Sequence, residues 1–255
     1  MTRLVTLTTD FGSGSGYVAE MKGCLLHAKT PIRLIDISHT IPSHDVRSTA
    51  WLIGQACHAF PADTLHIIVV DPGVGTERKM LWARIGDQEF ICPDNGILSW
   101  ALTKQPIVDA RVLSPPENIS FTFHGRDAFA PLAVKIIDGA RPTSLGPPAG
   151  NLQSLEWPKP TESHNNCFGE IINVDTFGNL ITNLPSEWLP KLIEKGGIYV
   201  DSYKVSNVVQ TYGQAPSNTL VTLVGSQGFI EVAVVQGRAD KRLSAGLGTP
   251  VSLRE

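Results

Sequence analysis

Strand-like and helix-like segments alternate through residues 4–70, and this alternation constrains the fold more than any other feature of the sequence. Continuous apolar runs predict buried strands at Leu4–Thr8, Ile32–Ile37 and Leu65–Val70. Apolar residues recur at helical spacing between them, which predicts helices at Tyr17–Lys29 and Val46–Phe60. Strands that alternate with helices in this way build parallel sheets. The sequence therefore predicts an α/β domain with a mostly parallel sheet sandwiched by helices.

Further elements are expected to extend this domain. The segments Leu81–Ile85 and Glu89–Cys92 have strand-like composition and are separated by a Gly-Asp turn, so we expect a hairpin added to the sheet. Another helix is predicted at Ala128–Ile137. Ser43 or Asp45 is expected to cap the second helix, because short polar side chains accept hydrogen bonds from the free N–H groups of the first turn.

The second half of the chain has a different texture. Residues 145–166 are rich in Pro, Ser, Asn and Gly without periodicity, so a linker is expected at 151–166 between an α/β domain at 1–150 and a second domain at 167–255. Beyond it, short strand-like runs are separated by turns, which predicts a smaller all-β, barrel-like domain. These predicted strands are Gly169–Val174, Ile198–Tyr203, Thr219–Val224, Phe229–Val235 and Val251–Leu253.

Charge and cysteine usage narrow the class of protein. The net charge is −3 and no block of Lys or Arg occurs, which argues against nucleic acid or an anionic membrane as the main partner. No apolar run approaches the length of a membrane span, and no signal-peptide pattern opens the sequence. The four cysteines are scattered and form no CxxC pair, so neither a disulfide framework nor a zinc site is expected. A cytoplasmic location follows from this cysteine usage.

Polar residues follow three of the predicted parallel strands. Asp10, His39 and Asp71 each come just after such a strand, at the edge of the sheet where ligands of α/β proteins bind. A single aspartate at a strand end is more often a turn former, but three polar strand ends at one edge favour a site. The glycines after Asp10 could surround polar groups of a ligand, although GSGSG is not a P-loop.

Two further motifs place charged residues beside glycine turns. VDPGVGTER puts Arg78 seven residues after Asp71, and TFHGRDAF contains His124, Arg126 and Asp127. Asp127 is expected to cap the helix that follows. A partly buried His124 could meet Asp71 and Arg78, and a purely structural histidine is an equally open interpretation of this pattern.

Several motifs together resemble one family. TTDFG, VDPGVGTER, CPDNGIL, FHGRDAFAP, VDTFGNLITN and SQGFIEVAV occur in the order and spacing of the S-adenosylmethionine (SAM) hydroxide adenosyltransferases, or SAM hydrolases, which are related to the SAM-dependent fluorinase and chlorinase. This resemblance implies hydrolysis of SAM to adenosine and L-methionine by attack of water or hydroxide at the ribose C5′. It also implies activation by a triad formed here by Asp71, Arg78 and His124, without a metal or cofactor.

The resemblance also implies a set of substrate-binding residues. Carboxylates are assigned to the polar ends of the substrate: Asp10 to the ribose hydroxyls and Asp175 to the methionine ammonium. Glu231 is placed at the same methionine end. The remaining assignments are Asn179 to the adenine edge, Phe177 and Tyr212 to packing on the base, Ser226 to the methionine carboxylate, and Val234 to backbone contacts with adenine.

Other functions stay open at the level of sequence. A SAM-dependent halogenase is disfavoured because Gly125 and Asp71 stand where the halogenases carry a serine and a tyrosine. A metallohydrolase could use Asp10, His39, Asp71 and His124, although their spacing matches no known ligand motif. A non-catalytic nucleoside-binding module would have no use for the triad. His44 is expected to be a surface histidine.

The family resemblance further implies a homotrimer with sites shared between subunits. Triad residues lie in the predicted α/β domain, and most binding residues lie beyond a Pro-rich linker that we expect to be extended. A β domain held in this way can meet a neighbouring chain as easily as its own, and head-to-tail contacts of this kind close into rings.

Overall fold

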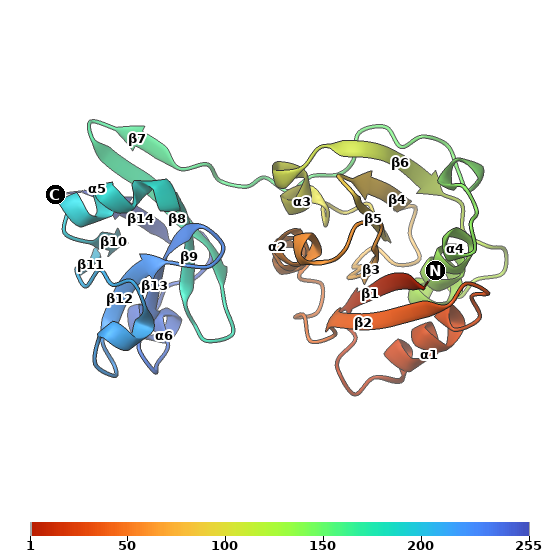
Figure 1. The fold of residues 1–255 in the computed structure, drawn as a ribbon, viewed down its shortest axis with the longest axis horizontal. Coiled ribbons are helices and arrows are strands. Elements are labelled where there is room, and N and C mark those ends of the chain that lie inside the picture. Colours follow the sequence, from red (N-terminus) through yellow and green to blue (C-terminus); the bar gives the residue numbers. More distant parts are fainter. Residues whose placement is uncertain (1, 255) are drawn as a thin grey trace. The chain divides into compact units, whose positions relative to one another are not determined.

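The computed structural model describes residues 2–254, and the chain divides into two compact units, residues 1–156 and residues 157–255. Figure 1 shows the first unit as a sheet with helices on both faces and the second as a largely β structure. The mixed α/β class predicted from the sequence is confirmed.

The N-terminal unit is built on a six-stranded sheet. Its strands are β1 (Arg3–Thr9), β2 (Ile32–Ser38), β3 (Leu65–Val69), β4 (Met80–Ile85), β5 (Gln88–Pro93) and β6 (Ile107–Leu113). They lie in the order β2-β1-β3-β5-β4-β6. β1 is parallel to β2 and β3, and β3 is parallel to β5, while β4 is antiparallel to both β5 and β6. The predicted hairpin therefore forms, with β5 inserted between β3 and β4.

Helices cover both faces of this sheet. The helices α1 (Gly16–Leu25) and α4 (Ala130–Ile137) pack with the inward side chains of β1 and β3, and α2 (Val46–Ala56) and α3 (Ser99–Lys104) pack on the opposite face. A carboxylate caps α2 as expected: Asp45 accepts a hydrogen bond of 2.9 Å from the Ser48 N–H. This three-layer arrangement leaves the carboxyl ends of β1 and β3 free to carry polar loops.

Several details of the predicted helices are wrong. The first helix ends at Leu25 rather than Lys29, and the second ends at Ala56, where a 3₁₀ turn, Cys57–Ala59, follows. The predicted helix at 128–137 begins earlier, as a π-helical turn at Gly125–Phe129 that continues into α4. Asp127 lies inside that turn and is not a helix cap, because its carboxylate accepts from the Ser120 N–H and pairs with Arg126.

The C-terminal unit is an antiparallel sheet that curls into a nearly closed, barrel-like structure. β11 and β12 are the first and last strands in the order of this sheet. An isolated β-bridge between residue 208, which follows β11, and residue 222 of β12 brings these two ends together. Apolar side chains from the strands and from α6 fill the interior. The order is β11-β10-β14-β8-β9-β13-β12, with β7 paired to β8. The strands are β7 (Thr161–Ser163), β8 (Asn166–Val174), β9 (Leu180–Pro185), β10 (Ile198–Val200), β11 (Tyr203–Val205), β12 (Leu220–Val224), β13 (Phe229–Val234) and β14 (Pro250–Leu253).

The C-terminal unit also contains short helices, and one of its predicted strands is wrong. The helical elements are the helices α5 (Leu189–Glu194) and α6 (Ala239–Leu243) and the 3₁₀ turns Ser186–Trp188 and Tyr212–Gln214. The N-terminal unit contains another 3₁₀ turn, Pro142–Ser144. The strand predicted at Ile198–Tyr203 is a tight hairpin instead, because Asp201 adopts a left-handed backbone conformation with a φ of 53°. Short polar residues such as aspartate tolerate that conformation and therefore reverse the chain.

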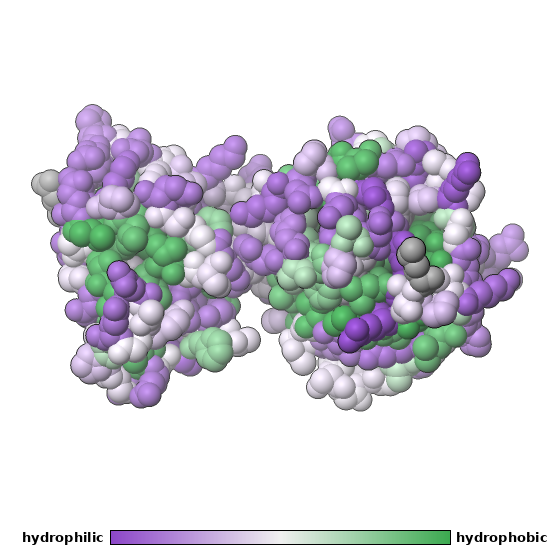
Figure 2. Space-filling model, viewed as in Figure 1, coloured by the Kyte–Doolittle hydropathy of each residue, from purple (hydrophilic) through white to green (hydrophobic). Residues whose placement is uncertain are grey.

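The surface mixes hydrophobic and hydrophilic side chains in both units on the face shown in Figure 2. Among residues 2–254, no helix has the length and apolar character needed to cross a membrane.

Candidate active site

A glycine-containing loop brings Arg78 back to Asp71. Asp71 lies just beyond β3, and the loop ends at β4 after a turn in which Gly75 has a φ of 78°. A side chain at Gly75 would place its Cβ 2.5 Å from the backbone oxygen of Phe121, and one at Gly73 would lie 3.0 Å from the Arg78 Cγ. Glycine at these two positions therefore lets the loop fold closely enough for the two charged residues to meet.

Three of the predicted site residues form one hydrogen-bonded group. The Arg78 guanidinium donates through Nε to both Asp71 carboxylate oxygens, at 2.8 and 2.9 Å, and through Nη2 to the second of them. The same Nη2 lies 3.0 Å from the His124 Nδ1. The Asp71 and Arg78 side chains are 5% and 10% exposed, so this ion pair is largely shielded from solvent. A forked, charge-assisted contact of this kind fixes both partners in orientation.

The contact with Arg78 determines which ring nitrogen of His124 carries the proton. A guanidinium can only donate, so the Nδ1 atom of His124 must accept, and the ring proton is then on Nε2. His124 is buried, at 7% exposure. Burial and the neighbouring Arg78 charge lower the pKa of His124 below its ordinary value, because both disfavour the imidazolium. The structure thus holds His124 as a neutral imidazole.

Asp71 and His124 line a cavity of about 310 Å³ together with Asp10, at the edge of the sheet where β1 and β3 end. Asp10 follows β1, and its carboxylate accepts a 2.8 Å hydrogen bond from the backbone N–H of His44. His44 is exposed, as expected, but it also lines this cavity and adopts a left-handed conformation with a φ of 66°. No sequence pattern predicts that backbone contact.

The third predicted strand-end residue, His39, does not line this cavity. Its ring lies between two groups from neighbouring strands, with Nδ1 at 2.9 Å from the Thr9 Oγ1 and Nε2 at 3.1 Å from the Asp36 Oδ1. Within residues 2–254, no three His, Cys, Asp or Glu side chains gather closely enough to hold a metal ion. The ligand set considered for a metallohydrolase is therefore not assembled.

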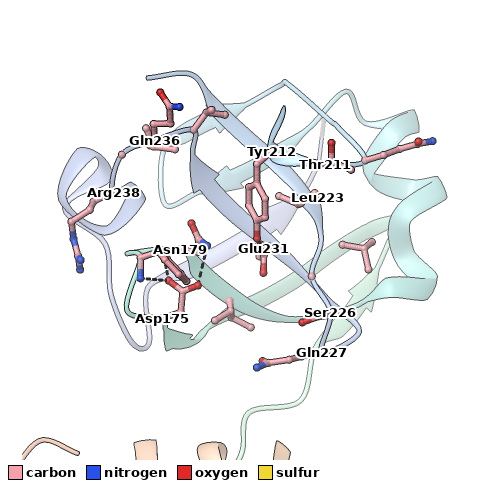
Figure 3. A pocket seen from close by; sticks show the side chains of 18 residues that line it. Asp175, Asn179, Thr211, Tyr212, Leu223, Ser226, Gln227, Glu231, Gln236 and Arg238 are labelled. Carbon is pink, nitrogen blue, oxygen red and sulfur yellow. Dashed lines mark hydrogen bonds between the residues drawn. The ribbon is translucent and has the colours of Figure 1, made fainter. Parts of the chain in front are cut away.

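The second group of predicted residues surrounds a larger cavity in the C-terminal unit, of about 940 Å³. All seven residues that the sequence assigned to this unit line it, namely Asp175, Phe177, Asn179, Tyr212, Ser226, Glu231 and Val234. Figure 3 shows Asp175 and Asn179 side by side at one wall, with Tyr212 pointing toward Glu231. A cavity of this size, with few charged groups among apolar ones, suits a small-molecule ligand.

Asp175 organises the turn that carries Asn179. One of its carboxylate oxygens accepts from the backbone N–H groups of Phe177 and Asn179, at 2.9 and 2.8 Å. The other accepts from the Asn179 side-chain amide at 2.9 Å, as drawn in Figure 3. The Asn179 side chain is therefore held with its amide nitrogen toward Asp175.

Tyr212 and Glu231 form a second polar pair in the same cavity. The Tyr212 hydroxyl donates to the Glu231 Oε1, and the pKa of Tyr212 is raised by burial and by this neighbouring carboxylate. Burial also raises the pKa of Glu231, and the negative charge of Asp175 adds to that effect. Two acidic side chains thus share one cavity, which favours a ligand with positive charge.

Two protein-family models match this chain. The model of the SAM hydroxide adenosyltransferase N-terminal domain matches residues 5–146, and the model of the corresponding C-terminal domain matches residues 169–252. The chain belongs to the SAM hydroxide adenosyltransferase family.

Similar proteins cover from three quarters to all of the chain. An (R)-S-adenosyl-L-methionine hydrolase of Thermus thermophilus is 34% identical over 98% of this chain and 99% of its own length. The crystal structure of an uncharacterised conserved protein from Thermotoga maritima has a TM-score of 0.88 at 31% identity, covering 100% of both chains. A fluorinase of an Actinoplanes species is more distant, at 24% identity over 76% of this chain and 74% of its own.

Within this adenosyltransferase fold, the structure identifies supporting residues that sequence reasoning missed. Phe11 and Tyr17 line the smaller cavity, and their rings contact each other and that of Phe123 edge to face. In the larger cavity, a side chain at Gly225 would place its Cβ 2.3 Å from the Glu231 Oε2, so glycine makes room for that carboxylate. The FGSGSGY and LVGSQGF runs, which contain Phe11, Tyr17 and Gly225, were the available sequence signals for these positions.

Proposed function

We propose that this protein hydrolyses S-adenosylmethionine to adenosine and L-methionine. The observation that carries this proposal is the single guanidinium that bonds both Asp71 and His124, at a cavity that Asp71 and His124 line. A nucleoside-binding module has no need for a buried ion pair in contact with a neutral histidine. The name of the Thermus thermophilus relative supports the same reaction.

In the proposed reaction, water attacks the ribose C5′. The O–C5′ bond forms while the C5′–S bond breaks, the sulfonium leaves as the neutral thioether of methionine, and one proton of the water is released. Asp71 is the group placed to accept that proton, and His124 donates a hydrogen bond through its Nε2–H to the attacking oxygen. Arg78 does not line the cavity, so it acts by fixing and charge-balancing the other two.

The rest of the substrate is assigned to residues of both cavities. Asp10 binds the ribose hydroxyls, Asn179 binds the adenine edge, and Phe177 and Tyr212 pack on the base. The two carboxylates of the larger cavity, Asp175 and Glu231, favour the methionine ammonium. The Arg238 guanidinium also lines this cavity, but it is paired with Asp240 and so does not neutralise them. Ser226 holds the methionine carboxylate, and Val234 offers backbone groups to adenine.

The direct test is chromatography after incubation with SAM. Adenosine and methionine in equal amounts support the proposal, and intact SAM after prolonged incubation contradicts it. Both sulfonium epimers should be supplied separately, because the Thermus thermophilus relative is named for the (R) form. Adenosine formation that persists with a chelator would agree with a reaction that needs no metal.

Substitution of the three bonded residues separates chemistry from binding. Asp71→Ala, Arg78→Ala and His124→Ala should each lower kcat by about 100-fold or more, the usual contribution of acid–base groups, while adenosine affinity measured by calorimetry is retained. Arg126→Ala is the matched control, because this arginine belongs to the same FHGRD motif but pairs with Glu20 and Asp127 on the surface. Loss of adenosine binding in Arg78→Ala would mean that Arg78 has a different role.

We also propose that the working form is a homotrimer whose sites combine the two cavities from different subunits. Apolar side chains at both cavities are exposed in the single chain: Tyr17 by 54% at the smaller one and Phe177 by 74% at the larger one. Burial of such side chains between subunits would complete the site and exclude water. The four free cysteines suit the cytoplasm, which we propose as the location.

Mixed oligomers test the shared site. After subunit exchange, an Arg78→Ala chain and an Asn179→Ala chain should together recover activity, because some of their shared sites contain both intact residues. Molar mass in solution should equal three chains. An active monomer, or no recovery after verified exchange, would contradict this arrangement.

A further inference from the structure

The CPDNGIL motif has no role in the site described so far. Its central residues, Asp94 and Asn95, form the turn after β5, and Asn95 lines neither cavity. β5 lies between β3 and β4 in the sheet. The turn is therefore located between the two ends of the loop that carries Asp71 and Arg78, since that loop leaves β3 and enters β4.

Both ends of that loop are hydrogen-bonded to this turn. The Asn95 side-chain amide donates to the backbone oxygen of Val70, directly before Asp71, at 3.0 Å. The backbone N–H of Asp94 donates to the backbone oxygen of Lys79, directly after Arg78, at 2.9 Å. The turn thus connects the residue before the carboxylate with the residue after the guanidinium.

The turn itself is held in a fixed conformation. The Asn95 Oδ1 accepts from the backbone N–H of Ile97 at 3.3 Å, so both polar atoms of this side chain are used. The Asp94 carboxylate accepts from the backbone N–H of Gln153 at 2.8 Å. Gly96 has a φ of 93°, a conformation that glycine adopts without strain. A rigid support of this kind can define the separation of the two loop ends.

We propose that Asn95 is a positioning residue for the hydrolytic reaction, which holds the loop ends so that Arg78 can bond Asp71 and His124 at the same time. This inference rests on the proposed function. Within the loop, backbone hydrogen bonds join Val74 to Asp71 and Thr76 to Gly73, and neither bond connects the backbones of its two ends. Misplacement of reacting groups by about 1 Å can cost about 100-fold in rate, so a small relaxation of the loop is sufficient for a large effect.

The test is Asn95→Asp, which keeps the size of the side chain and the acceptor for Ile97 but places an oxygen against the Val70 oxygen. We expect kcat to fall about 10- to 100-fold while KM for SAM and affinity for adenosine stay within twofold. Asn207→Asp is the matched control, because the Asn207 amide makes an equivalent 2.9 Å bond to the Leu220 backbone oxygen and Asn207 lines neither cavity. The control should keep full kcat even where its Tm falls.

A second variant gives a readout that stability alone does not change. Asn95→Ala removes the donor without adding charge, so the loop relaxes and Arg78 withdraws from His124. Because the Arg78 charge contributes to lowering the pKa of His124, that pKa should rise in Asn95→Ala. NMR titration of the His124 ring, assigned with His124→Gln, measures this shift, and Asn207→Ala should leave it unchanged.

The outcomes separate the positioning role from the proposed reaction. If the wild-type protein hydrolyses SAM and both Asn95 variants keep kcat and the His124 titration of the wild type, the positioning role is wrong. If the wild-type protein hydrolyses no SAM, the proposed function fails, and the His124 titration in Asn95→Ala then tests only whether Asn95 holds Arg78 against His124. A lower Tm with unchanged kcat and unchanged titration would also refute it.

Discussion

His66 should make the N-terminal unit less stable in mild acid. This residue lies in the central strand β3, is fully buried, and contacts two polar side chains. Its Nε2 is 3.2 Å from the Gln88 Oε1, and its Nδ1 is 2.8 Å from the Thr6 hydroxyl. The Gln88 amide nitrogen donates to backbone oxygens, so the Gln88 oxygen must face His66. His66 therefore carries its proton on Nε2 and accepts from Thr6 through Nδ1.

The burial of His66 determines how much stability the N-terminal unit loses in acid. It lowers the pKa of His66 from the ordinary 6.5 to about 4, because the charged ring would lose its hydration. The unfolded chain then binds a proton that the folded chain does not, so stability is complete above pH 6.5 and is lost as the pH falls toward 4. At about 1.4 kcal/mol for each pKa unit, the full loss is about 3 kcal/mol. Linkage over the same window gives about 2 kcal/mol lost by pH 5.

The assay is urea unfolding between pH 8 and pH 4.5, with His66→Gln as the comparison because it has no titrating ring. Trp157 and Trp188 are replaced by Phe in both proteins, so that fluorescence reports only on the N-terminal unit. The wild-type background should lose about 2 kcal/mol more than the variant between pH 8 and pH 5. Exposed histidines and carboxylates contribute equally to both proteins. Parallel pH dependences would refute a buried, neutral His66.

Three other outcomes follow from the site. Because burial and Arg78 lower the pKa of His124, kcat/KM should stay constant as the pH falls through 6.5 and should decline only at lower pH, where the imidazole gains a proton. A decline of kcat/KM centred above pH 6.5 would contradict this expectation. Gly75→Ala should lower the free energy of unfolding by about 1–3 kcal/mol and should lower kcat, because the added Cβ would lie 2.5 Å from the Phe121 backbone oxygen. In the same thermal and kinetic assays, the control Gly139→Ala should lose less stability and keep kcat, because Gly139 also has a positive φ, of 94°, but has open space around its Cβ. Incubation of SAM with excess chloride should yield adenosine and no 5′-chloro-5′-deoxyadenosine by mass spectrometry, and substantial chlorinated nucleoside would favour the halogenase alternative.

Local patterns identified most of the sheet but not its order. Apolar periodicity located β1, β2 and β3 to within one or two residues, because a buried strand needs continuous apolar side chains. The segments β6 and α3 were missed. β6 carries Asp109 and Arg111 inside its run and lies at the edge of the sheet, where these half-buried positions tolerate charge. The six residues of α3 are too few to show a helical period.

Motif spacing identified residues that share a cavity but not all their contacts. Asp10 and Asp71 were predicted at one edge because parallel strands end together, and both line the smaller cavity. The same reasoning included His39, whose ring instead hydrogen-bonds Thr9 and lies against Asp36. A strand-end position defines where the backbone is, whereas the direction of a side chain depends on which groups of the neighbouring strand can pair with it.

The sequence by itself determined the succession of strands and helices, the largely β character of the second unit, and the positions of charged site residues beside glycine turns. These features depend on neighbours within a few residues of each other. Only the tertiary structure decided that β5 lies between β3 and β4, so that Asn95 bonds Val70 across 25 residues of chain, and that Arg78 meets His124 across 46. Such contacts form when the sheet buries its apolar faces, and the energy of that burial depends on side chains throughout the unit.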